Sequence, residues 1–201
     1  NDYTDGIALQ SIKLVFEWLE KSVKTADPEA REKMHNASTM AGMAFANAFL
    51  GMSHSMAHKI GAVHHTVHGR TNAILLPYVI RYNGTRPSKT TTWPKYNYWK
   101  ADEKFQDIAK MLGLPHSTPE EAVEAYAKAV YELGVAVGIK MNFKDQGIDE
   151  KAWKDSLHEI ALLAYEDQCS PANPRLPMVA DMEEIMADAY YGYAERPGRR
   201  K

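Results

Sequence analysis

Apolar positions recur at three- and four-residue intervals along most of the chain. The first such run comprises Ile7, Leu9, Ile12, Leu14, Val15, Trp18 and Leu19. This spacing predicts an amphipathic helix that is capped near Thr4 and ends at about Lys24. A second start signal follows at Asp27, Pro28 and Glu29, which supply a cap residue, a proline for the first turn and an early acid.

The segment 37–63 has a different pattern, because it is poor in charge and rich in Ala, Met, Gly and Phe. A helix that is apolar nearly all round is typical of a buried position. The pattern therefore predicts that this segment lies at the centre of the core. Gly42 and Gly51 would either allow a close approach of neighbouring backbones or mark a break.

The rest of the chain alternates between helical patterns and loops. Helices are predicted over 72–82, 102–112, from the capping box at 118–121, 149–165 and 181–190. Pro77 should kink or divide the first of these. Loops are predicted at 64–70, 84–97 and 169–177. Because no run of alternating β-branched residues occurs, we predict an all-α fold of seven to nine helices. It should form one domain over 1–194, followed by a basic flexible tail over 195–201.

Composition narrows the classes of function. Lys and Arg number 24 and Asp and Glu 26, so the net charge is −2. No strong field would attract nucleic acid or an anionic membrane. No apolar run approaches the ~18 residues that span a bilayer, and residues 1–5 carry no signal-peptide pattern. Cys169 is the single cysteine, which indicates a reducing compartment. We therefore expect a cytoplasmic protein.

Histidine is the residue type that suggests chemistry. Five of the eight histidines lie between residues 54 and 68, far more than an even distribution would place there. His54 and His58 are four residues apart on a predicted helix, so both imidazoles lie on one face. His68 follows a loop that could return it to the same space. Because the helix is otherwise apolar, we expect the first two rings to lie inside, where they would need partners.

Two interpretations of this cluster remain open from the residues alone. Imidazole is a common ligand of Zn, Fe and Ni, which favours a metal or catalytic site. The alternative is a pair of histidines that lies at the surface or is satisfied by polar partners. A metal site needs three or four ligands, and no histidine has an acid four residues before it. The set therefore looks incomplete. A four-helix carboxylate centre would need repeated Glu-x-x-His pairs on facing helices, and the sequence shows no such repeat.

One longer pattern does match a known family. The stretch 51–61, with His54, His58 and Gly61, is followed by His68-Gly69 and by 72–77. It resembles the iron-containing (group III) alcohol dehydrogenase family. Residues 45–48, 167–169 and 173–175 match as well, and Val67 stands where the family commonly has proline. The opening residues and 31–50 are most similar to the C-terminal half of bifunctional aldehyde–alcohol dehydrogenases.

The resemblance implies a role for particular residues. His54 and His68 would be two of the four ligands of a divalent metal, usually Fe(II) and sometimes Zn. His58 would lie near the nicotinamide and the substrate as a catalytic proton-relay or positioning residue. Phe45 and Cys169 would line the pocket where substrate and NAD meet. The remaining Asp and His ligands belong, in the family, to a helix upstream of the position at which this chain starts.

The resemblance also implies an architecture and an activity. The fold would be the bundle-like C-terminal domain of the dehydroquinate synthase-like architecture, without its N-terminal α/β nucleotide-binding domain. The intact enzyme would interconvert a primary alcohol such as ethanol and its aldehyde with NAD. We expect the isolated chain to be inactive, metal-poor and without NAD, and to form homo-oligomers through its exposed face. The alternative is a non-catalytic helical scaffold with relic histidines.

Overall fold

A computed structural model describes residues 1–87 and 99–192, and the regular secondary structure in this part of the chain is all helical. It contains eight α-helices and one short 3-10 helix, which confirms the predicted all-α fold. Their bounds are α1 Asp2–Thr25, α2 Pro28–Ala48, α3 Met52–His64, α4 His68–Gly84, α5 Ala101–Met111, α6 Pro119–Ala136, α7 Glu150–Tyr165, η2 Ser170–Ala172 and α8 Val179–Tyr191.

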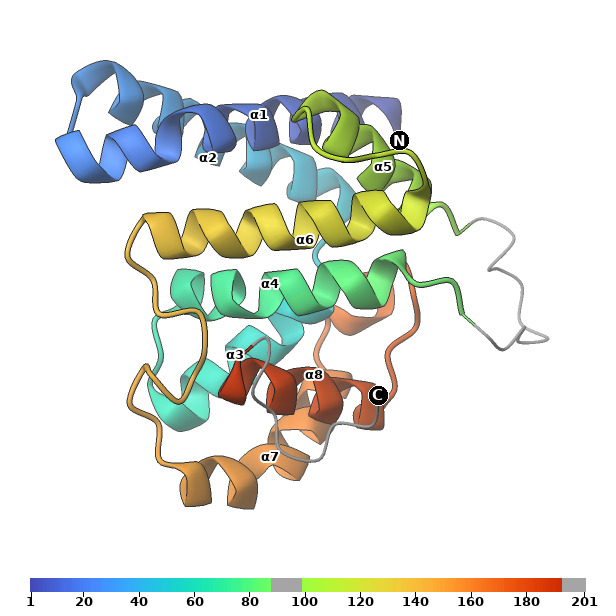
Figure 1. Ribbon diagram of the computed structural model, residues 1–201. Coiled ribbons are helices and arrows are strands. Elements are labelled where there is room, and N and C mark those ends of the chain that lie inside the picture. The colour runs from blue at the N-terminus through green and yellow to red at the C-terminus, as the bar shows by residue number, and fades with distance from the viewer. Residues whose placement is uncertain (88–98, 193–201) are drawn as a thin grey trace.

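Helix α4 runs through the middle of the molecule and joins two hydrophobic cores (Figure 1). On one side it packs with α3, α7 and α8 around Met56, Ile60, Leu75 and Trp153. On the other side Ile80 packs with α5 and α6, against which part of α1 also lies. Because α4 contributes to both cores, the position of its first residue, His68, is fixed by the whole bundle.

The start of α3 is held by a buried amide rather than by a side-chain cap of its own. The backbone N–H of Met52 donates to Asn173 Oδ1 at 3.2 Å, and Asn173 Nδ2 donates to Asn83 Oδ1 at 2.7 Å. A Cβ on Gly51 would lie 2.8 Å from Asn173 Oδ1, so only glycine permits this approach. The contact ties the helix that carries His54 to the loop that carries Cys169.

The prediction that 37–63 lies centrally in the core is wrong for its first half. In α2 the buried residues are Ala30, Ala37 and Ala44, which form a thin stripe against α1. Ser11 Oγ donates to the carbonyl of Ala37 at 2.7 Å across this contact. Small side chains let the two helices approach closely, while Met43, Phe45 and Phe49 stay exposed. In the second half of the segment, α3 is central as expected.

Other boundaries differ by a few residues. Helix α1 is capped by Asn1, whose Oδ1 accepts from Thr4 N–H. Gly51 lies at the break between α2 and α3, and marking a break was one of the two roles expected for it. The predicted loop at 64–70 shrinks to 65–67, because α4 already begins at His68. Pro77 does not divide α4. Helix α8 starts two residues before Asp181, and Asp181 accepts from the N–H of Met178. The predicted tail over 195–201 lies outside the described residues.

Within the described ranges, none of the helices has the length and apolar character that crossing a membrane requires.

Candidate metal and active site

Three histidine rings gather where α3 meets the start of α4. The ring centroids of His54 and His68 are 5.3 Å apart, those of His58 and His68 5.4 Å, and those of His54 and His58 6.2 Å. The four-residue spacing along α3 accounts for the distance between His54 and His58. The tight turn at 65–67 accounts for the others. The structure therefore brings together the three residues that the sequence singled out.

The turn before α4 sets the direction of His68. Val67 caps the helix with φ −70°, close to the value that proline would fix, so valine adopts a φ that proline would also permit. Asn72, one turn on, places its Nδ2 3.1 Å from His68 Nε2. Asn72 Oδ1 in turn accepts from Ser53 Oγ at 3.0 Å. A polar chain thus links α3 and α4 beside the histidines.

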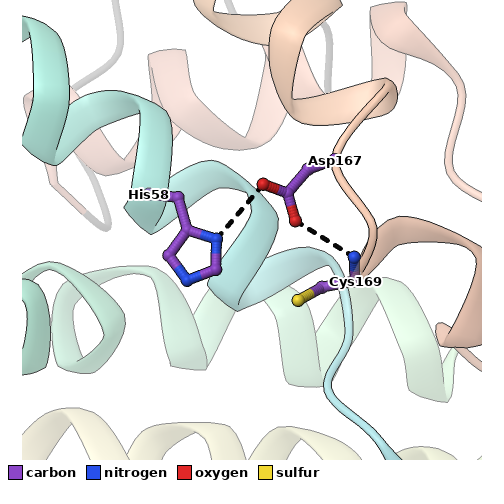
Figure 2. A group of neighbouring side chains, drawn as sticks. All are labelled: His58, Asp167 and Cys169. Atoms are coloured by element: carbon purple, nitrogen blue, oxygen red, sulfur yellow. Dashed lines mark hydrogen bonds and ion pairs between the residues drawn. The ribbon is translucent and has the colours of Figure 1, made fainter.

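His58 has a different partner, which comes from the loop after α7. Its Nδ1 lies 3.2 Å from Asp167 Oδ2 (Figure 2). Lys59 Nζ lies 2.9 Å from the same oxygen. The other oxygen, Oδ1, accepts the backbone N–H of Cys169 at 3.0 Å. Asp167 thus joins two consecutive residues of α3 to the loop that carries Cys169.

The electrostatics of this group follow from its burial. Burial would raise the pKa of Asp167, but the Cys169 N–H, Lys59 and His58 outweigh it and hold the pKa at about 2. The carboxylate therefore stays ionised. Burial raises the pKa of the Cys169 thiol, and the neighbouring Asp167 charge raises it further, so the thiol stays protonated. Burial, followed by the neighbouring His68 and His58, lowers the pKa of His54 and favours its neutral form.

The three histidines lie at a surface and not inside the core, which corrects the expectation that the first two rings are interior. His54 and His58 are half-buried and His68 is exposed. The reason is that the large apolar residues of α3, such as Met56 and Ile60, occupy the opposite face. The imidazoles therefore face outward, and a metal held there would be open to ligands from another polypeptide segment.

The donor set on this face fits part of a metal site. Two imidazoles on one tetrahedral ion, with metal–nitrogen distances of about 2 Å, place their ring centroids about 5 Å apart. The separation of His54 and His68 matches this value, as does that of His58 and His68, and neutral imidazole suits Fe(II) or Zn(II). Two ligands do not complete a site, so further donors are needed.

A second cluster is a weaker candidate for a metal. Ligand atoms of His58, Asp167 and Cys169 all lie within 4.8 Å of one another. However, Lys59 already neutralises the carboxylate, and both of its oxygens accept hydrogen bonds. The protonated thiol is also a poor ligand. This cluster orients side chains more readily than it binds a cation.

The predicted pocket residues lie in two places. Cys169 is buried beside Asp167, close to His58. Phe45 lies on α2 with 44% of its surface exposed and lines a hollow between α1 and α2. Its role beside the substrate stays a prediction, as do the roles assigned to His54, His58, His68 and Cys169.

Sequence reasoning missed Asp167, Lys59 and Asn72 as parts of the site. Asp167 and His58 are separated by 109 positions, so no local spacing could pair them. The matched stretch around residues 167–169 was the one available signal. Asn72 lies four residues after His68, and that spacing could have suggested the contact.

Fold and site together define a class: an all-helical domain that presents a partial imidazole site on an open face. The model of the Fe-containing alcohol dehydrogenase family, C-terminal, matches residues 1–190. The chain belongs to this family.

Similar proteins agree with this assignment. The chain is 80% identical over its full length to the aldehyde-alcohol dehydrogenase of Streptococcus pneumoniae serotype 2, of which it covers 23%. It is 39% identical over 96% of its length to the bifunctional aldehyde-alcohol dehydrogenase of Escherichia coli K12, of which it covers 22%. Among solved structures, a 1,3-propanediol oxidoreductase aligns with a TM-score of 0.81 and 33% identity, over 94% of this chain and 46% of that one. The chain thus spans less than a quarter of these curated relatives.

Proposed function

We propose that this chain is the metal- and substrate-binding part of an iron-type alcohol dehydrogenase that interconverts a primary alcohol, such as ethanol, and its aldehyde with NAD. The observation that carries the proposal is the convergence of His54, His58 and His68 on one open face. The names of the most similar relatives support the further proposal that the whole protein is a bifunctional aldehyde–alcohol dehydrogenase.

His54 and His68 would hold the metal, together with ligands from outside this chain. When bound, Fe(II) or Zn(II) supplies Lewis acidity toward the alcohol or aldehyde oxygen. His58, next to both rings, would accept or return the proton of the alcohol. Cys169 and Phe45 would border the space for the substrate. The three histidines lie at the open face, whereas Cys169 is buried beside Asp167 and Phe45 lies in a hollow between α1 and α2.

The nucleotide would be bound elsewhere. None of the 12 glycines forms a Gly-x-Gly pair, so this chain has no phosphate-cradling loop of that type. We propose that a separate nucleotide-binding domain packs against the histidine face and that the enzyme works in the cytoplasm as a homo-oligomer. By itself this chain should be inactive, since it has no Gly-x-Gly loop for the dinucleotide phosphates and its two candidate imidazole ligands do not complete a metal site.

The test uses the intact protein. Purified enzyme is assayed for ethanol oxidation with NAD⁺ and acetaldehyde reduction with NADH, before and after removal of metal by a chelator, and after addition of Fe(II) or Zn(II). We expect activity that is lost with the metal and restored by one of the two ions. Activity that survives complete metal removal, or an intact protein with no activity in any metal form, would contradict the proposal. The second outcome would favour a helical scaffold.

A further inference from the structure

We propose that Asp167 is a positioning residue that holds the His58 imidazole in one orientation and one tautomer, so that its Nε2 faces the reacting alcohol. The inference rests on the proposed function for the identity of the reaction. The positioning itself rests on contacts within this chain.

Hydrogen bonds and an ion pair hold the Asp167 carboxylate in one orientation. Its side chain is 7% exposed. Oδ1 accepts the N–H of Cys169 at 3.0 Å, while Oδ2 lies 3.2 Å from His58 Nδ1 and 2.9 Å from Lys59 Nζ. The backbone around it is equally fixed, because its N–H donates to the Ala164 carbonyl and its carbonyl accepts from the Ser170 N–H. A carboxylate held at both oxygens and on both sides of its backbone cannot easily turn toward another partner.

The ion pair with Lys59 indicates that Asp167 orients a side chain and does not bind a metal. An ammonium group on the same oxygen that faces His58 balances the buried negative charge without a metal ion. Because Lys59 already compensates the negative charge of Asp167, this carboxylate is a poor ligand for a divalent cation. The carboxylate–imidazole contact resembles the second-sphere contacts by which other active sites orient a histidine.

The contact selects a tautomer. An ionised carboxylate accepts and cannot donate, so the Nδ1 that faces it must carry the hydrogen. In neutral His58 the lone pair then lies on Nε2, and this nitrogen points away from Asp167 (Figure 2). In alcohol oxidation the hydride would go to NAD⁺, and Nε2 of His58 could accept the proton of the hydroxyl group. Asp167 stays ionised throughout and touches neither substrate nor cofactor.

Replacement of Asp167 by Asn keeps the size of the side chain but changes the hydrogen bond that it offers to His58. The amide of Asp167→Asn fills the same space and can still accept the Cys169 N–H. Its NH₂ group can donate to Nδ1, which would move the hydrogen to Nε2 and remove the base. In the intact enzyme we expect kcat for alcohol oxidation to fall about 10- to 100-fold with metal content unchanged. The KM for the alcohol should change little. Glu166→Gln removes a neighbouring exposed carboxylate and should leave kcat as in the wild type.

A double-mutant cycle tells positioning from a structural role. If Asp167 acts through His58, Asp167→Asn should cause no further loss of kcat in a His58→Ala background. Independent, multiplicative losses would overturn the proposal. So would an unchanged kcat in the single variant, or the loss of bound metal, which would make Asp167 a ligand. Should Asp167→Asn fold poorly because Lys59 lacks its partner, Asp167→Asn combined with Lys59→Met removes both charges and should show the same loss of kcat.

A structural readout keeps this test independent of the proposed function. In a crystal structure of the Asp167→Ala variant of the intact protein, the His58 ring should leave its position or occupy several. An unchanged ring would overturn the inference even if the protein proved not to be a dehydrogenase. Conversely, a displaced ring in a protein without dehydrogenase activity would keep Asp167 as the orienting residue and reject the proposed function alone.

Discussion

At the scale of single residues, the buried carboxylate of Asp167 makes the site sensitive to acid. Its pKa is about 2 in the folded chain and about 3.8 in an unfolded one. Because the pKa is lower in the folded chain, the ionised carboxylate stabilises the folded state above pH 3.8. This stabilisation is lost as the pH falls toward 2. We predict that Asp167 contributes about 2 kcal/mol at neutral pH, of which about half is lost by pH 3.

Urea unfolding of the wild type and of Asp167→Asn between pH 6 and pH 3 measures this contribution. The difference in unfolding free energy between the two proteins should be constant near pH 6 and shrink by about 1 kcal/mol by pH 3. A difference that stays constant over this range would mean that the carboxylate has an ordinary pKa. Glu166→Gln, with its exposed carboxylate, is the matched control and should parallel the wild type.

Sequence reasoning reached the histidines of the site but not what surrounds them. His54 and His58 share a helix face, and a short turn returns His68, so local spacing sufficed to group them. Asp167 meets His58 across 109 positions, a contact that depends on how α7 packs against α3. The degree of burial was also misjudged, because an apolar helix was taken to be buried on every face. Met56 and Ile60 show which face is inside only once the fold is known.

At the scale of helices, two glycines in similar sequence surroundings have opposite roles. Gly42 lies inside α2 with open space where a Cβ would be, whereas a Cβ on Gly51 would meet Asn173 Oδ1 at 2.8 Å. We predict that Gly42→Ala stabilises the protein by about 0.5–1 kcal/mol, because alanine loses less chain entropy in a helix.

The matched variant Gly51→Ala should destabilise by about 1–2 kcal/mol, because the added methyl group displaces Asn173 and leaves buried amide groups unpaired. Gly51 has φ −132°, a value open to any residue, so backbone strain cannot explain such a loss. Thermal unfolding of both variants by calorimetry compares them with the wild type. Shifts of the same sign would show that Asn173 does not hold the start of α3.

The fold class and several helix starts were predictable because caps, prolines and apolar spacing act locally. Asp27, Thr118 and Asp149 cap α2, α6 and α7 at the expected positions. The burial of α2 was not predictable in the same way. A run rich in alanine and methionine has no clear polar face, and α2 in fact buries only the alanine stripe against α1.

At the scale of the whole molecule, apolar side chains near the end of α2 remain uncovered. Met43, Phe45 and Phe49 are between 44% and 50% exposed. We predict that the purified chain associates through this surface, because burying it against another copy removes apolar area from water.

Size-exclusion chromatography with light scattering, over a range of concentrations, measures this association. The double variant Met43→Glu with Phe45→Glu should shift the chain toward the monomer. Leu163→Glu, at an exposed apolar position on α7, is the control and should not. A wild-type chain that stays monomeric at every concentration would show that the surface does not self-associate.

We propose that His54 and His68 hold a catalytic metal in the intact protein, and metal analysis tests this most directly. Elemental analysis of the purified intact protein is compared for the wild type, His54→Ala, His68→Ala and, as a control at an exposed histidine of α2, His35→Ala. We predict bound Fe or Zn in the wild type and in His35→Ala, and nearly complete loss in the other two variants. Retention of the metal in both His54→Ala and His68→Ala would contradict the account.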